Sequence, residues 1–411
     1  MIPERPRLRP LEAFPITADG RQLICIRDPT NVSEAVLMFP PSVVPILAAL
    51  DGEHSILDIQ AAETRRQGRL VFGAEIERLI RTLDEHLFLD GPTLDAARRA
   101  QRELFHQSPV RPAFHAGKAY DGDPGALRTK IDSFFTHPEG PGLAQPEGPR
   151  RRLTGVLAPH IDFHRGGPAY AWAYKALGES EPADLYVILG TCHAGLDGPF
   201  AVTLKPYDTP FGPLAVDRDF VEALGRRSGL DLFEGELGHR TEHAIEFQAV
   251  FLQYLFAGRR EVRTVPILAS FLHELMALGK DPAQDSDVQR FVEALGETIA
   301  SWPGKICLVG GVDLAHVGPR FGDSEPVTEA MLRRVAEEDL AMLAHVTTGD
   351  ADGFYESVAR DGDRRRICGL SPIYTLLRVM KGQGSLLRYA QWPDPQGTVT
   401  FASLVFSREG G

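Results

Sequence analysis

Three histidines follow apolar segments of the chain, each at the point where a buried strand would end. The segments are LTGVLA, LYVILG and KICLVG, and the histidines after them are His160, His193 and His316. In open α/β sheets, ligands bind outside the carboxyl ends of the strands. If these segments form neighbouring parallel strands, the three imidazoles converge at one edge of the sheet. A single histidine at a strand end is more often a structural residue, but three in equivalent positions favour a metal site.

A helical segment, EHAIEFQ, adds a further histidine and a carboxylate. His243 and Glu246 are three residues apart and therefore share one face of a helix. Imidazole and carboxylate together suit a divalent transition metal. Asp162, Asp313 or Glu246 would complete a histidine–carboxylate set, or would orient a ligand from outside it. His243 and His316 are the candidate general bases.

Two cysteines lie close to these motifs. Cys192 precedes His193, and Cys368 lies in the segment RRRICGLSPIY. Each is either a thiolate ligand or redox thiol, or a small buried apolar residue. The four cysteines form no CxxC pair, which favours reduced thiols in a cytoplasmic protein. Other chemistries are not indicated, since the chain has no GxSxG, GxxxxGK[ST] or strand-following GxGxxG motif.

Composition and charge restrict the class of protein. The chain has 411 residues, of which 43% are hydrophobic and 24% charged, as in ordinary globular proteins of two or three domains. Its formal net charge of -12 argues against nucleic acid as a partner. The first residues carry no apolar signal segment, and the longest apolar run is too short to span a membrane. We therefore expect neither a membrane nor a nucleic-acid interaction.

The elements that must position the histidines come from residues 110–411. Apolar strands alternate there with helical segments, which predicts an α/β layered domain. The five predicted strands are LTGVLA, LYVILG, RTVPIL, KICLVG and TVTFASLVF. The predicted helices cover 168–178, 242–256, 287–301, 326–346 and 371–381.

Residues 1–90 are predicted to form a separate small domain, and 91–109 a helical connector. Ser55 and Asp58 form a capping-box pattern, and apolar residues mark one face of a helix over 74–86. The segment HLFLDGP is a candidate wing. Residues 51–90 hold nine acidic and five basic residues, and this negative net charge opposes contact with phosphate groups. On LDGEHSILDI and IERLIRTLDEHLFL, this region resembles the PqqD-like winged-helix fold, which implies recognition of a peptide; a packing domain without a ligand is the alternative.

Residues 110–408 resemble the MEMO family, called AmmeMemoRadiSam system protein B in prokaryotes. The resemblance rests on VRPAFHAGKAY, APHIDFHRGGPAYAWAYKAL, LGTCHAG, EHAIEFQ, DLAHVGPRFGD and ICGLSPIYTLL. It implies a three-layer α/β/α fold similar to class III extradiol dioxygenases (LigB-like). It also implies a metal on His160 and His193, and partnership with a radical SAM protein and an AMMECR1-like protein.

The resemblance also bears on the third ligand and the metal. In some members a cysteine precedes the histidine of DLAHVG and binds the metal, and Ala315 occupies that position here. His316, Asp313 or Glu246 must then replace it. We expect Fe(II), with Zn, Mn or Cu as alternatives. The expected function is a metal-dependent, dioxygenase-like redox enzyme; the alternatives are a peptide- or partner-binding accessory protein and a scaffold without catalysis.

Overall fold

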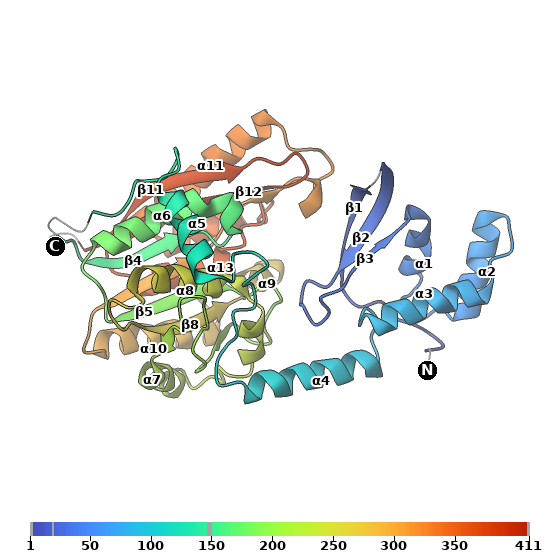
Figure 1. The fold of residues 1–411 in the computed structure, drawn as a ribbon, viewed down its shortest axis with the longest axis horizontal. Helices are drawn as coiled ribbons and strands as arrows, with labels where there is room; N and C mark the ends of the chain where they lie inside the picture. Colours follow the sequence, from blue (N-terminus) through green and yellow to red (C-terminus); the bar gives the residue numbers. More distant parts are fainter. Residues whose placement is uncertain (1–2, 19, 146–149, 409–411) are drawn as a thin grey trace. The chain divides into compact units, whose positions relative to one another are not determined.

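The computed structural model describes residues 3–18, 20–145 and 150–408 and divides the chain into two compact units (Figure 1). The units are Met1–Ser108 and Pro109–Gly411. The segment predicted as a connector forms α4 (Pro92–Gln107), which belongs to the first unit.

The N-terminal unit combines a small antiparallel sheet with helices. The sheet has the order β1 (Glu12–Ala18), β2 (Arg21–Arg27), β3 (Val36–Phe39). The helices that follow are α1 (Val44–Ala48), α2 (Ile56–Gln67) and α3 (Gly73–Glu85). Ser55 and Asp58 form the complete capping box at the start of α2, as the sequence predicts. The predicted wing at 86–92 contains no strand; its Leu89 makes only an isolated bridge with Leu8.

The C-terminal unit is an α/β domain with a mixed sheet. In the described residues the sheet order is β10-β12-β4-β9-β5-β8-β6, with β11 paired to β12 and β7 to β8. The five predicted strands correspond to β4 (Leu153–Ala158), β5 (Leu185–Thr191), β8 (Arg263–Ala269), β9 (Ile306–Gly311) and β12 (Thr398–Ser407). The sequence analysis did not identify β6 (Phe200–Val202), β7 (Ala215–Val216), β10 (His316–Val317) and β11 (Gln383–Trp392).

Helices cover both faces of this sheet. Successive strand residues point to opposite faces, and both sets are apolar and must be buried. Val187 and Leu189 of β5 belong to one buried cluster, and Tyr186 and Ile188 to the other. The first cluster includes residues of α7 (Arg218–Ser228), α10 (Ser286–Ser301), α11 (Glu329–Thr348), α12 (Ala351–Ala359) and α13 (Leu370–Val379). The second includes residues of α5 (Pro124–Phe135), α6 (Phe163–Glu179) and α8 (His243–Phe256). No helix in the described residues is long and apolar enough to cross a membrane.

The centre of the sheet determines where the site lies. Strand β9 lies between β4 and β5 and pairs with both in parallel register. The carboxyl ends of these three strands therefore meet at one edge, where each chain segment continues into one of the histidine motifs. The predicted convergence of the histidines depended on this parallel pairing of neighbouring strands.

Candidate metal centre

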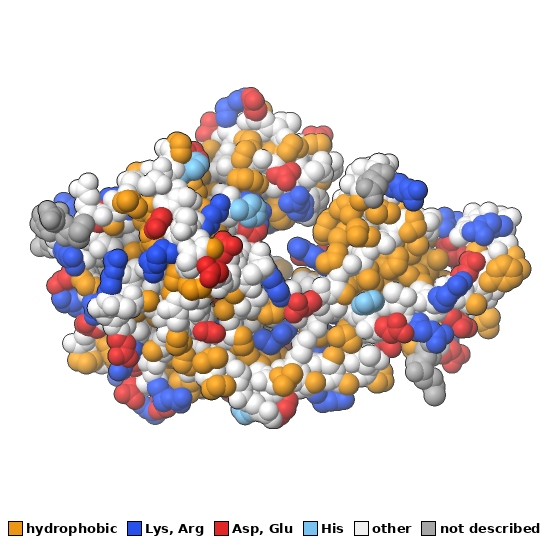
Figure 2. All heavy atoms as spheres, viewed as in Figure 1, with side chains coloured by type: hydrophobic (Ala, Val, Ile, Leu, Met, Phe, Trp, Pro, Cys, Tyr) orange, Lys and Arg blue, Asp and Glu red, His pale blue; other side chains and the backbone are white. Residues whose placement is uncertain are grey.

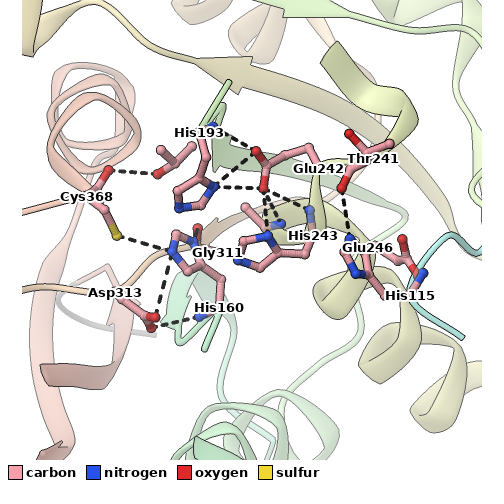
Figure 3. A network of polar contacts seen from close by, with 12 residues as sticks. His115, His160, His193, Thr241, Glu242, His243, Glu246, Gly311, Asp313 and Cys368 are labelled. Atoms are coloured by element: carbon pink, nitrogen blue, oxygen red, sulfur yellow. Dashed lines mark hydrogen bonds and ion pairs between the residues drawn. The ribbon is translucent and has the colours of Figure 1, made fainter. Parts of the chain in front are cut away.

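Three histidines meet beyond the carboxyl ends of β4 and β5 (Figure 3). His160 follows β4, His193 follows β5, and His243 is the first residue of α8. One ring nitrogen from each lies within 4.8 Å of the others. The ring centroids are 4.7 to 5.1 Å apart. The three-histidine group is thus compact enough for one metal ion, and it contains His243 where the sequence analysis had placed His316.

His160 is held with one ring nitrogen directed at the group. Its Nδ1 lies 3.0 Å from the carbonyl oxygen of Gly311. A carbonyl oxygen only accepts, so Nδ1 carries the hydrogen and the lone pair of the ring is on Nε2. The side chain is 2% exposed, and this burial lowers the pKa of His160 to about 3. At neutral pH the imidazole is therefore uncharged and able to bind a metal.

Glu242 organises the other two histidines. Its carboxylate accepts from the backbone N–H groups of His193, His243 and Ala244, at 2.8, 2.8 and 3.0 Å. The same carboxylate lies 3.0 Å from Nδ1 of His193 and so orients that ring. Burial would raise the pKa of Glu242, but His193 and His243 beside it hold that pKa well below its usual value. Glu242 is also the N-cap residue of α8, so one buried charge fixes both the helix start and the site.

His243 completes the group and stays neutral. Burial lowers the pKa of His243 well below its usual value, although the charge of Glu242 acts in the opposite direction. The ring stacks on that of His193 with an interplanar angle of 16°. Its exposed side-chain fraction is 30%, against 36% for His193 and 2% for His160. The group therefore has one buried side and one side open to solvent.

Cys368 and Asp313 lie on the buried side of the group, next to His160. The Sγ atom of Cys368 is 3.2 Å from Nε2 of His160. Asp313 accepts from the backbone N–H of His160 at 2.9 Å, and its second oxygen lies 3.7 Å from the His160 Nε2. Burial raises the pKa of Asp313 to about 6 and that of Cys368 well above its usual value. Both contact His160, and neither is a member of the three-histidine group.

His316 and the remaining sulfur candidates have different surroundings. The Nδ1 of His316 lies 3.1 Å from the Leu314 carbonyl oxygen, and its ring meets Phe321 edge-on. His316 is not a member of the three-histidine group. The buried Sγ of Cys192 lies 3.3 Å from the carbonyl oxygen of Gly195. Ala315 is 0% exposed and belongs to the hydrophobic core. The thiol that the structure brings against a histidine of the group is that of Cys368.

Glu246 is directed away from the three histidines and into a buried ion pair with Arg111. Both side chains are 0% exposed. Glu246 also accepts from the Tyr120 hydroxyl at 2.5 Å and from the backbone N–H of His115 at 2.9 Å. With these partners its carboxylate is fully engaged. Glu246, which the sequence analysis named as a possible ligand, is therefore not a member of the three-histidine group and stabilises the structure beside it.

Arg111 connects the first segment of the C-terminal unit to the turn before α8. Its guanidinium donates to the carbonyl oxygens of His239 and Glu242, each at 2.7 Å. It therefore anchors the backbone of the residue that organises the histidines. Sequence reasoning missed Arg111, Tyr120 and Glu242. An acidic residue directly before a helical pattern was the one available signal for Glu242.

The donor set fits a transition metal. Histidines that bind metals generally donate their second ring N–H to a carbonyl or carboxylate, as His160 and His193 do here. Three imidazole nitrogens with a nearby thiol and carboxyl suit Fe(II), Zn(II), Mn(II) or copper, and do not suit Mg²⁺ or Ca²⁺, which prefer oxygen ligands.

Comparison with known proteins identifies the class. The family model described as Memo-like protein matches residues 111–405. A MEMO1 family protein of Aquifex aeolicus is 28% identical over 387 residues, covering 93% of this chain and 95% of the relative. A MEMO1 family protein of Methanopyrus kandleri is 30% identical over 303 residues, covering 71% of this chain and 97% of the relative. The chain belongs to the MEMO family.

The two relatives differ in how much of the chain they match. The Aquifex match covers more of the chain than the C-terminal unit contains, so it extends into the N-terminal unit. The Methanopyrus relative is matched almost completely by a part of this chain about as long as the C-terminal unit. The metal-site unit therefore corresponds in size to a complete MEMO protein.

Proposed function

We propose that the C-terminal unit binds one divalent transition metal on His160, His193 and His243, and that the protein is a metal-dependent redox enzyme. The observation that supports this most is the compact group of three imidazoles. Two of them are oriented through their second ring nitrogen, by a buried carboxylate and a backbone carbonyl. We take Fe(II) as the first candidate, with Zn, Mn or Cu as alternatives.

The surrounding residues have separate roles in this proposal. When bound, Fe(II) would supply redox chemistry and open coordination positions for small ligands. Cys368 and Asp313 contact His160 on its buried side, where the loss of a proton from either would add a negative charge next to the metal. Burial lowers the pKa of His316, which keeps its imidazole neutral and able to take a proton. His193 and His243, the more exposed members, mark the side from which a substrate approaches.

The dioxygenase-like reaction, and the similarity to class III extradiol dioxygenases, form the finer part of the proposal. It is supported by a histidine-rich site at the carboxyl ends of parallel strands in a mixed α/β sheet. The test is to load the protein anaerobically with Fe(II), then to measure O₂ consumption with a panel of catechols. Turnover that is lost in the His316→Phe variant while the metal content is retained would support the reaction and the base. Full metal loading with no O₂ consumption would reduce the proposal to metal binding alone.

A second candidate, an accessory protein that binds a peptide, is favoured by the N-terminal unit. Hydrophobic side chains gather over β1–β3 in Figure 2. Strand β3 is at the edge of its sheet, and its Val36 and Met38 are 55% and 54% exposed. An open strand edge with apolar side chains suits the addition of an extended peptide. The partner system would contain a radical SAM protein and an AMMECR1-like protein.

The peptide hypothesis has its own test. Fluorescent peptides from the proteins encoded beside this gene would be titrated against the full chain and a Met38→Lys variant. We expect a peptide that binds the wild type and loses at least tenfold in affinity in the variant. Equal binding to both proteins, or salt-sensitive binding of DNA instead, would contradict it.

A further inference from the structure

A cleft in the C-terminal unit is lined by positively charged side chains. Its volume is about 490 Å³, and its lining includes four cationic side chains, those of Arg152, Arg378, Lys381 and Arg408. No Asp or Glu is among the described residues that line it. In a chain of net charge -12, a cleft with four cations and no acid is a marked segregation of charge.

The sheet register explains why the cations meet. Arg152 directly precedes β4 and Arg408 directly follows β12, and Ser407 pairs with Leu153 where these antiparallel strands end. Ser407 also pairs with Gln383 at the start of β11, two residues after Lys381. Arg378 lies in the last turn of α13. The adjacent ends of β4, β11 and β12, with the end of α13, therefore bring the four cations to one cleft.

Most of this charge is not compensated by an ion pair within the described residues. Arg378 has a carboxylate partner, Asp352, at 3.0 Å. For Arg152, Lys381 and Arg408 the described part of the chain supplies no ion pair within 4.0 Å. Like charges at opposed strand ends repel each other, so this arrangement costs free energy unless an anion occupies the cleft.

Part of the lining of the cleft is apolar. Ile306 and Leu308 of β9 and the side chains of Trp302 and Met380 contribute to it. Arginine presents planar forks of N–H donors that match phosphate oxygens. A lining that combines apolar side chains with arginines therefore matches a small molecule with phosphate groups and an aromatic or apolar body.

This cleft is separate from the metal centre. It lies at the amino ends of β4 and β9, whereas the three histidines lie beyond the carboxyl ends of β4 and β5. The six residues of β4 alone separate the two places by about 17 Å. We propose that this cleft is a second ligand site, which binds a phosphorylated small molecule of the nucleotide class. The proposal does not depend on the function of the metal centre.

The test uses the full chain with three probes: ATP, inorganic pyrophosphate and adenosine, titrated by calorimetry at low and physiological salt. We expect ATP to bind more tightly than either fragment, and to weaken as the salt concentration rises. The double variant Arg152→Gln, Arg408→Gln should lose at least tenfold in ATP affinity. The matched control, Arg226→Gln with Arg333→Gln, removes two exposed arginines that do not line the cleft and should bind like the wild type.

Three results would overturn the proposal. One is the absence of ATP binding by the wild type at millimolar concentration. Another is an equal loss of affinity in the control variant, which would show a general effect of charge. The third is tighter binding of a single-stranded oligonucleotide than of ATP. Equal thermal unfolding temperatures for all variants would show that each variant is folded, so that a lost affinity reports on the cleft itself.

Discussion

At the scale of single residues, Glu242 is the group on which the site depends most. Its carboxylate binds the ring and backbone of His193 and the backbone of His243. We expect Glu242→Gln to keep the helix cap but to lower metal affinity 10- to 100-fold, because an oriented, charge-stabilised imidazole is lost. A competition titration against a chromophoric chelator measures this. Glu236→Gln, whose carboxylate bonds Thr203 and no histidine, is the control. Unchanged affinity in Glu242→Gln would contradict the assigned role.

Cys368 should determine which metal is preferred. A thiolate is a soft ligand that favours Cu(I), whereas imidazoles and carboxylates suit divalent ions. Since the Cys368 Sγ lies next to the His160 Nε2, Cys368→Ser should weaken Cu(I) binding at least tenfold more than Zn(II) or Fe(II) binding. Parallel titrations with Cu(I) and Zn(II) measure the ratio. Cys307→Ser is the comparison, and it should leave both affinities unchanged, because the Cys307 Sγ is in the hydrophobic core and bonds the carbonyl oxygen of Leu308.

Sequence reasoning predicted part of this residue-level arrangement. His160 and His193 could be predicted because each follows a strongly apolar strand. The position of His316 after β9 carries the same pattern, yet its ring is turned toward Leu314 and Phe321. The backbone N–H of His316 donates to the carbonyl oxygen of Arg365, and a contact so distant in the sequence leaves no local pattern. The roles of Glu242 and Cys368 are determined in the same non-local way.

At the scale of elements, the segment that contains Arg111 braces the start of α8. We expect Arg111→Met to destabilise the C-terminal unit by about 3 to 5 kcal/mol, because Glu246 would remain as a buried charge without its partner. Urea unfolding followed by tryptophan fluorescence measures this, since all three tryptophans, Trp172, Trp302 and Trp392, lie in that unit.

Arg226→Met is the control for this change. Its side chain is 71% exposed, and its substitution should alter stability by no more than about 0.5 kcal/mol. A loss below about 1 kcal/mol in Arg111→Met would show that the ion pair does not brace the helix.

Elements with uniform burial were the ones that sequence patterns could predict. Strand β5 is buried at all seven positions, and its apolar run is continuous. Strand β11 mixes exposed and half-buried residues without regular alternation, so no strand period marks it. Strands β6 and β7 have three and two residues, too few for any period. The prediction of a wing at 86–92 was wrong, since this segment contains no strand. Its apolar residues Phe88 and Leu89 are instead buried members of the core of the N-terminal unit.

At the scale of the whole molecule, acid should destabilise the N-terminal unit. In the N-terminal unit, Asp28 and Arg9 form a buried ion pair at 2.6 Å. Burial would raise the pKa of Asp28, but Arg9 and the N–H groups of Ser33 and Thr30 lower it to about 2. The pair therefore contributes about 2 kcal/mol above pH 4, and this contribution is lost as the pH falls from about 4 to about 2.

Hydrogen exchange of peptides from β2, measured by mass spectrometry on the full chain, would follow this loss. After correction for intrinsic rates, protection should fall between pH 4 and pH 2. In Asp28→Asn the protection should be lower throughout and nearly independent of pH in this range. A wild type whose corrected protection is constant down to pH 2 would contradict the prediction.

The central claim is that His160, His193 and His243 together bind one divalent metal, and an anaerobic titration with Co(II) tests it most directly. Co(II) has visible d–d bands whose intensity reports coordination number, and it binds the same ligand types as Fe(II) and Zn(II). The wild type should bind about one equivalent, and each single His→Ala variant should lose stoichiometric binding, because each lacks one nitrogen ligand. His164→Ala, a histidine outside the group, should bind like the wild type. Stoichiometric binding with unchanged bands in all three variants, or no binding by the wild type, would contradict the account.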